Sequence, residues 1–362
     1  MKEKKESLKL KELIGSLTKT NRILIDIGTN SIKMAEIEKQ GKKIIVKHIE
    51  KIGDMEKYHK GSENTNITAI VNDIEEKSQL NNLRKKEVEL IYGNKKMQSK
   101  IFMVKAGKDK EMQETVDLEI EKSFGSTLEE GGYILDYCKM GNIMNREKTE
   151  EAILVVLAEE ENVMDYVNAF EGKGMTVKEV QPNIVGLLNA LKMVDTESEY
   201  KMLLNMGNDH SIIVFTIDGV PVYNRTINFG SNYLLNKLQT RLNKTKEELE
   251  EMMFEVGLGE IESTNASYND PYDYGTSEEN EEEYKDDYIM AQVSPNKEQE
   301  DEVVEILKEN FENFIIEVER SMTFVKQNTR FEAEKIHISG GLANIQGLKG
   351  YLNNSLHQKF NL

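Results

Sequence analysis

Three short segments of the chain carry small, polar and acidic residues in an order that suits phosphate and metal binding. Two of them read almost alike: ILIDIGTNSIKMAEI from Ile23 and MLLNMGNDHSIIVFTI from Met202. Each is an apolar run, then Asp or Asn, one apolar residue, Gly, a few small polar residues and a second apolar run. This pattern predicts a tight hairpin between two strands. The exposed N–H groups of such a hairpin can hold phosphate, and its acidic side chain is left to face a metal ion or water.

The third segment is KIHISGGLANIQGLKGYL from Lys335, which reads as a strand leading into Gly340 and Gly341 at the start of a helix. Glycines at such a turn let the backbone approach a ligand closely. Two hairpins, one in each half of the chain, can clamp the two sides of a nucleotide. The glycine turn would complete the set.

The elements around these segments follow an α/β pattern that occurs twice. In the first half, the sequence predicts strands at 23–27, 32–37, 44–49 and 88–92 and a helix at 67–80. In the second half, it predicts a similar meander within 202–228, a helix at 231–242, another from Thr245 and a long helix at 302–326. Glu248, three residues after Thr245, predicts a capping box. A chain of 362 residues is long enough for two lobes, each with its own core.

A compact module separates the two halves. Its predicted elements are strands at 101–104, 133–139, 153–157 and 175–180 and helices at 110–124 and 161–170. The module looks inserted, because a predicted helix at Asn183–Leu191, begun after Pro182, returns the chain to the first lobe.

Together and in this order, the three segments resemble the nucleotide-binding loops of the actin-like ATPase superfamily. Within it the chain looks most like the family of PilM, the cytoplasmic actin-like component of type IV pilus assembly. The resemblance runs from about Arg22 to the C-terminus and includes RTINFG from Arg225 and the inserted module. It implies an α/β, two-lobed actin-like (ribonuclease H-like) ATPase fold with an inserted subdomain of the type found in PilM and the cell-division protein FtsA.

The resemblance also implies how the chain is divided. The expected parts are an N-terminal tail at 1–21, a first lobe at 22–97 plus 182–200, the inserted subdomain at 98–181, a second lobe at 201–244 plus 321–362, and a second-lobe insertion at 245–320 with an acidic loop at about 261–296.

At the site, the resemblance assigns a role to each matching residue. Asp26 would hold hydrated Mg²⁺, and the loop amides, Ser31 and Lys33 would bind the phosphates of ATP or ADP. The full set of nucleotide-binding residues implied in this way is Asp26, Gly28, Thr29, Asn30, Ser31, Lys33, Asn205, Gly207, Ser211, Glu250, Gly340 and Gly341.

Two residues depart from the family pattern. Asn205 stands where the second hairpin should carry an acid, and a neutral amide cannot act as a base and holds Mg²⁺ or attacking water less strongly. Met253 occupies the lysine position of a Glu–Lys pair around the ribose, whereas Glu250 fits the pattern. The sequence therefore predicts nucleotide binding with weak or absent hydrolysis, and it offers no catalytic residue.

Other interpretations of the same residues stay open. Gly28 can simply permit the hairpin, and Asp26 can cap it. A sugar or acetate kinase-like phosphotransferase shares the hairpins but needs an acid placed to take the substrate proton, which Asn205 cannot do. An FtsA-like scaffold would end in an amphipathic membrane helix, whereas this chain ends in SLHQKFNL, which favours PilM.

By resemblance, the protein would bind the cytosolic N-terminal peptide of an inner-membrane PilN-type protein in a groove between the first lobe and the inserted subdomain. A pilus assembly ATPase is a second candidate partner, and self-association into a ring or filament is compatible with the resemblance. We expect a cytoplasmic protein that is peripheral to the inner face of the cytoplasmic membrane through its partners.

Composition agrees with these expectations. The single cysteine, Cys138, excludes an internal disulfide and fits a reducing compartment. A net charge of −18 disfavours nucleic acid as a partner. The apolar runs are too short for a transmembrane helix, and the five histidines lack the spacing of zinc ligands.

The N-terminal tail carries an apolar stripe at helical spacing. The stripe consists of Leu10, Leu13, Ile14 and Leu17, with lysines beside and before it. The tail is either a short basic amphipathic helix that binds an anionic membrane or a partner, or a disordered segment.

Overall fold

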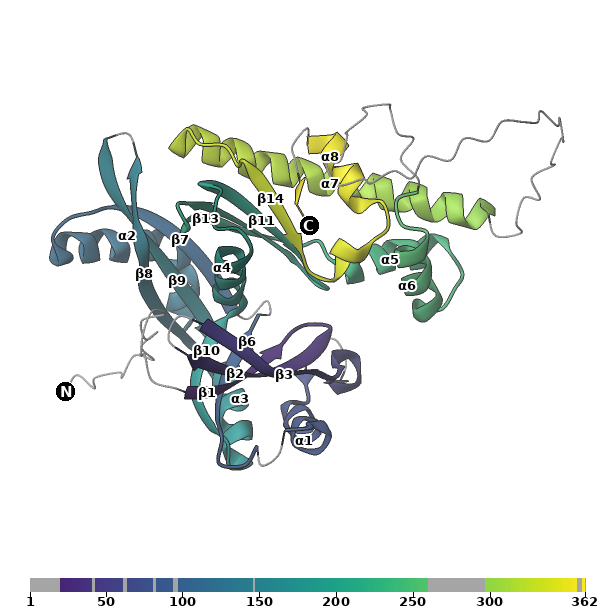
Figure 1. Cartoon of the computed structure of the whole chain (residues 1–362), viewed down its shortest axis with the longest axis horizontal. Coiled ribbons are helices and arrows are strands. Elements are labelled where there is room, and N and C mark those ends of the chain that lie inside the picture. Colours follow the sequence, from purple (N-terminus) through teal and green to yellow (C-terminus); the bar gives the residue numbers. More distant parts are fainter. Residues whose placement is uncertain are drawn as a thin grey trace, which may run out of the picture.

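The computed structural model describes residues 20–40, 43–60, 64–80, 83–93, 97–145, 147–259, 297–356 and 360–361. The expectations for the N-terminal stripe and for the acidic loop at 261–296 lie outside the described residues. Two lobes with a module at one side make up the described chain (Figure 1). No helix within these ranges is long and apolar enough to span a membrane.

Each lobe is built on a five-stranded sheet, and the two sheets have the same connectivity. The first contains β1 (Thr20–Ile27), β2 (Ser31–Gln40), β3 (Lys43–Asp54), β6 (Glu87–Tyr92) and β10 (Thr176–Pro182), in the order β10-β6-β1-β2-β3. The second contains β11 (Tyr200–Met206), β12 (Ser211–Ile217), β13 (Val220–Ile227), β14 (Lys335–Ser339) and β15 (Phe360–Asn361), in the order β13-β12-β11-β14-β15. In both, three strands form an antiparallel meander, and two later strands add in parallel beside the first. The predicted repeat of the meander is therefore confirmed.

Helices pack on the sheets and connect the lobes. In the first lobe, β3 is followed by η1 (Met55–Tyr58), β4 (His59–Lys60), β5 (Asn64–Thr65) and α1 (Ile67–Lys77). The connection from β10 to the second sheet is α4 (Asn183–Val194). The second lobe carries α5 (Ser231–Arg241), α6 (Lys246–Glu255), α7 (Lys297–Thr329), η2 (Gly341–Asn344) and α8 (Leu348–Leu356).

The start of α6 confirms the predicted capping box. The Thr245 hydroxyl accepts a hydrogen bond from the Glu248 N–H, and the Glu248 carboxylate accepts one from the Thr245 N–H. Two N–H groups that the helix itself cannot satisfy are thus paired.

An apolar cluster around α4 joins the lobes and the module. Its buried members are Ile184, Val185, Leu188 and Leu191 of α4, Leu203, Ile212 and Val214 of the second sheet, and Ile101, Ala152, Leu154 and Val156 of the module. The same helix contacts β6 and β10 of the first sheet. This one helix therefore contacts the first sheet, the second sheet and the module.

The module is a three-stranded antiparallel sheet with one helix. Its elements are β7 (Met97–Lys105), α2 (Asp109–Glu130), β8 (Tyr133–Asn145) and β9 (Lys148–Glu159), with the strands in the order β7-β9-β8. Ile153, Val155 and Leu157 of β9 join the cluster with α2, while Ala152 and Leu154 join the cluster with α4. Because both faces of β9 are buried, its sequence is a continuous apolar run rather than an alternating one.

The Asn224 side chain of β13 fastens the module to the second lobe. Its oxygen accepts a hydrogen bond from the Ile101 N–H (2.8 Å), and its nitrogen donates one to the Ser99 carbonyl (2.9 Å). Both partners belong to β7, so the edge of the second sheet and the edge of the module lie side by side.

The segment from α3 (Glu160–Gly172) to β10 lies with the first lobe, which differs from the expected division. β10 pairs in parallel with β6, and Tyr166, Phe170 and Met175 are part of the first-lobe core. The expected subdomain at 98–181 therefore takes in two elements of the first lobe, and the three-stranded module spans 97–159. The apolar periodicity of these elements shows that each has a buried face but not which sheet covers that face.

The expected division of the second lobe at residue 320 falls inside one helix. α7 is continuous over 33 residues. Its buried side chains, from Val303 to Val325, share one core with Leu249 and Met253 of α6 and with the second sheet. The described parts of 245–320 are thus built into the second lobe.

Replacing Phe170 with alanine should destabilise the protein by about 3–5 kcal/mol, because this ring is fully buried in the first-lobe core. Leu118 of α2 is 60% exposed, so Leu118→Ala is the control and should stay within about 0.5 kcal/mol of the unmodified protein. Urea unfolding measures both. A loss for Phe170→Ala as small as that of the control would contradict the packing of α3 in the first lobe.

Candidate nucleotide-binding site

The first hairpin joins β1 to β2 as predicted. The Gly28 N–H donates to the Ser31 carbonyl (3.2 Å), which closes a tight turn. Asp26 and Lys33 lie opposite each other on the two strands, with 3.6 Å between the carboxylate oxygen and the ammonium nitrogen. Ser31 is buried, whereas Thr29 is half-buried and Asn30 at the tip of the turn is exposed.

The Asp26 carboxyl is the polar group of this hairpin most affected by its surroundings. Burial raises its pKa above the ordinary value, and the Lys33 ammonium opposes that effect only in part. The Asp26 side chain is still 38% exposed, so the effect of burial on this carboxyl is partial.

The second hairpin joins β11 to β12 in the same way. The Gly207 N–H donates to the His210 carbonyl (3.1 Å). The Asn205 side-chain oxygen accepts a hydrogen bond from the Ser339 hydroxyl (3.0 Å), which holds it at the end of β11 beside β14. Ser211 is fully buried, and its hydroxyl donates to the Phe229 carbonyl (2.7 Å). This buried hydrogen bond therefore connects the second hairpin to the loop that contains Phe229.

The glycine turn packs directly against the second hairpin. Gly340 has φ of +93°, and a Cβ built on it would lie 2.2 Å from the Met206 carbonyl oxygen. Only glycine fits at this position, for both reasons. A Cβ on Gly341 would meet no heavy atom within 4 Å, so the backbone there is open to a ligand. The glycine turn at Gly340 and Gly341 therefore lies beside the second hairpin, as predicted.

Asn208 brings the two hairpins together. Its side-chain nitrogen donates to the Thr29 carbonyl at the tip of the first hairpin (3.4 Å). The contact spans the two lobes, so the first and second segments meet although most of the chain's elements lie between them in sequence. The sequence pattern predicted the two loops but gave no role to Asn208.

The N-terminus of α5 is a further part of this arrangement that sequence reasoning missed. The Ser231 hydroxyl donates to the Asn208 side-chain oxygen (2.6 Å), and the Asn232 N–H donates to the Asn208 carbonyl (3.0 Å). A Cβ on Gly230 would lie 2.2 Å from that same carbonyl oxygen. The available signal was the Gly-Ser-Asn sequence at the start of a helix, where polar side chains commonly cap backbone groups.

The two residues expected near the ribose lie on α6. Met253 is fully buried in the core of the second lobe, and Glu250, on the same helix, is half-buried. Lys246, the first residue of α6, forms a salt bridge of 2.9 Å with Glu56 of η1 in the first lobe. α6 thus contacts both lobes.

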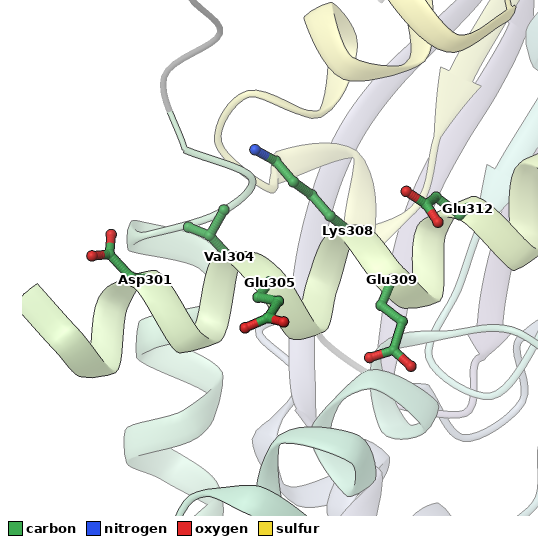
Figure 2. Close-up of a pocket in the computed structure, with 6 residues that line it drawn as sticks. All are labelled: Asp301, Val304, Glu305, Lys308, Glu309 and Glu312. Atoms are coloured by element: carbon green, nitrogen blue, oxygen red, sulfur yellow. The ribbon is translucent and has the colours of Figure 1, made fainter.

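A surface groove of about 370 Å³ lies along α7 and contains none of the predicted site residues. It is lined by Asp301, Val304, Glu305, Lys308, Glu309 and Glu312, whose side chains project to both sides of the helix (Figure 2). Repulsion between its four carboxylates and a triphosphate makes it unsuited to a nucleotide.

Asp26→Asn should raise the thermal midpoint of the protein near pH 7. Because burial raises the pKa of Asp26 in the folded state, that state binds the proton more tightly than the unfolded chain does. The stability contributed by the protonated form is present at acid pH and is lost as pH rises through the folded-state pKa. Asparagine carries no charge, so its advantage in thermal midpoint should grow as pH rises from 4 through the folded-state pKa of Asp26 and stay level above it. A variant that is no more stable than the original at any pH would contradict this.

Comparison with known proteins identifies the family. The model of the family described as type IV pilus assembly protein PilM matches residues 24–272. A solved structure described as a PilM-PilN type IV pilus biogenesis complex is similar to this chain with a TM-score of 0.68 and 15% identity, and the match covers 95% of this chain and 88% of that one.

More distant structures are also similar. A Bacteroides thetaiotaomicron protein with an actin-like ATPase fold has 8% identity, coverage of 96% and 94%, and a TM-score of 0.46. MreB5 of Spiroplasma citri bound to ADP has 11% identity, coverage of 94% and 92%, and a TM-score of 0.46. No curated protein matches the sequence. The chain has an actin-like fold, and it belongs to the PilM family of type IV pilus assembly proteins.

Proposed function

We propose that this protein binds ATP or ADP with Mg²⁺ where its two hairpins meet, and that it serves type IV pilus assembly by holding the cytosolic N-terminal peptide of a PilN-type inner-membrane protein. The observation that carries the nucleotide part is the contact between the hairpins, made by Asn208 and Thr29. Family membership supports the role in the pilus. The similar complex supports the class of partner.

The residues at the hairpins fit a magnesium nucleotide. A Cβ on Gly28 would lie 3.1 Å from the Ser31 carbonyl oxygen, which is a tight contact, whereas a Cβ on Gly340 would clash outright with the Met206 carbonyl. The amides of the first turn and of Gly341 would bind phosphate oxygens, and Lys33 would balance their charge. Asp26 would hold a hydrated Mg²⁺, which supplies further charge neutralisation when bound.

Asn205 limits what the site can do with a bound nucleotide. It is held by Ser339 at the end of β11, where the family pattern has an acid. An amide cannot take the proton of an attacking water, so hydrolysis lacks its base. The same argument disfavours a kinase-like phosphotransferase, which would need a base for its substrate hydroxyl.

The purified protein should bind ATP and ADP in the presence of Mg²⁺ and hydrolyse ATP slowly or not at all. Asp26→Ala should weaken binding of the magnesium nucleotide by about tenfold or more, because it removes the carboxylate that holds the hydrated metal. Isothermal titration calorimetry measures the affinities, and phosphate release measures turnover.

Asn205→Asp is the matched variant for this experiment, since it restores an acid of the same size. It should leave nucleotide binding in place and raise the rate of hydrolysis. Calorimetry without a signal for either nucleotide would rule out the proposed site. Rapid turnover by the unmodified protein would rule out the role given to Asn205.

The first sheet supplies a surface for the partner peptide. Residues directly opposite each other on paired strands share a face of the sheet. On one face, the register of β1, β2 and β3 aligns two rows: Leu24, Ala35 and Ile49 in one, and Arg22, Ile37 and Val46 in the next. Glu89 of β6 and Glu179 of β10 continue the first row.

One end of this face lies beside the module. Burial, with smaller contributions from Asp136 and Glu179, raises the pKa of the Cys138 thiol of β8 to about 11. Glu179 therefore lies near β8. Arg22 pairs with Glu89 at 2.9 Å, which adds a charged group to this part of the face.

The other end of the face is apolar and open. Ile49 is 71% exposed and Val46 is 58% exposed, both on β3, which is the edge strand of the sheet. An extended peptide with apolar side chains at every second position would cover such a strip and run toward the module. A partner with a single membrane span would thereby hold the protein at the inner face of the membrane.

Ile49→Asp should weaken binding of a synthetic peptide from the cytosolic N-terminus of the PilN-type partner by about tenfold or more, because it puts a charge in an apolar contact. Val194, at the end of α4, is 72% exposed, so Val194→Asp is the matched control and should bind normally. Fluorescence anisotropy with labelled peptide measures both.

Equal affinities for Ile49→Asp and the unmodified protein would place the peptide elsewhere. A point variant is preferable to deletion of residues 98–181, because that deletion would also remove α3, β10 and the module side chains that cover α4.

A further inference from the structure

Two side-chain polar contacts between described residues link the first lobe directly to the second, in addition to the packing around α4. The first is the hydrogen bond from Asn208 to the Thr29 carbonyl (3.4 Å). The second is the salt bridge between Lys246 of α6 and Glu56 of η1 (2.9 Å). In Figure 1, α6 lies on the side of the second lobe that faces the first lobe.

Within the first lobe, the two contact points are joined directly. The Met55 N–H donates to the Asn30 carbonyl (2.8 Å). Asn30 follows Thr29 in the hairpin, and Met55 precedes Glu56 in η1. One backbone hydrogen bond therefore links the hairpin tip to the residue before Glu56, which pairs with Lys246.

Within the second lobe, the two contact points are joined through helices. Asn208 accepts hydrogen bonds from Ser231 and Asn232 at the start of α5, and α5 packs against α6. The capping box at Thr245 fixes the backbone from which Lys246 projects. The two interlobe contacts are thus linked to each other within each lobe.

We propose that the Asn208–Thr29 and Lys246–Glu56 contacts form an interlobe latch that holds the lobes closed and sets the rate at which nucleotide leaves. The statement about nucleotide rests on the proposed function, whereas the statement about closure does not. The lysine and glutamate side chains are 40% and 73% exposed. An exposed ion pair is weak and is screened by salt, which suits a contact that must open and close.

The electrostatic half of the latch can be tested by charge reversal. Lys246→Glu and Glu56→Lys each place like charges opposite each other and should speed release of a fluorescent ADP analogue about two- to fivefold. The double variant restores an opposite pair and should return the rate to that of the unmodified protein. Arg241→Glu is the control, because Arg241 pairs with Glu309 inside the second lobe with similar exposure.

Closure of the lobes can also be measured in the absence of nucleotide. Glu76 of α1 and Glu251 of α6 are exposed and lie in different lobes. Spin labels at Glu76→Cys and Glu251→Cys, in a Cys138→Ser background, report the distance between the lobes by pulsed electron paramagnetic resonance. The mean distance should lengthen and the distance distribution should broaden in each single charge variant and in Asn208→Ala. Both should return to those of the unmodified protein in the double charge variant.

The outcomes separate the two proposals. An unchanged distance in all three single variants would overturn the latch. A longer distance with an unchanged release rate would overturn its control of nucleotide exchange. If the unmodified protein binds no ADP analogue but the distance responds as expected, the latch stands and the proposed nucleotide site fails.

Discussion

The burial of α4 is the constraint on which the rest of the structure depends. One face of this helix contributes Ile184, Val185, Leu188 and Leu191 to a cluster that also contains side chains of the module and the second sheet, and the helix contacts the first sheet as well. The hydrophobic effect does not specify direction, but close packing of one helix against three partners does specify their relative positions. That packing joins the two lobes that carry the hairpins, and Asn208 and Thr29 make the contact between the hairpins themselves.

Features determined by local chemistry could be predicted from the sequence. The two hairpins, the glycine turn and the capping box at Thr245 each depend on residues that are neighbours in the chain. The pairing of Asp26 with Lys33 follows from the hairpin register. Much of the fold and most of the backbone of the candidate site could be predicted in this way, because they consist of strands and turns that have recognisable sequence patterns.

Features determined by contacts between distant segments could not be predicted in the same way. Nothing in the residues near Asn208 indicates that its side chain reaches Thr29 or that Ser231 donates to it. The burial of the Ser211 hydroxyl likewise depends on the Phe229 carbonyl in a later loop. To predict that α3 and β10 lie with the first lobe, one would need to know which sheet has a free edge for β10. Apolar periodicity reveals that a helix or strand has a buried face, but it does not identify the element that packs against that face.

The attachment of the module by Asn224 has a mechanical consequence. Through that side chain and the shared core at β9, the module is attached to the second lobe, whereas its β8 strand lies near Glu179 of the first sheet. Rotation of one lobe against the other would therefore change the spacing between the module and the Glu179 end of the first sheet. A ligand that contacts both the first sheet and the module would therefore bind with an affinity that depends on the angle between the lobes.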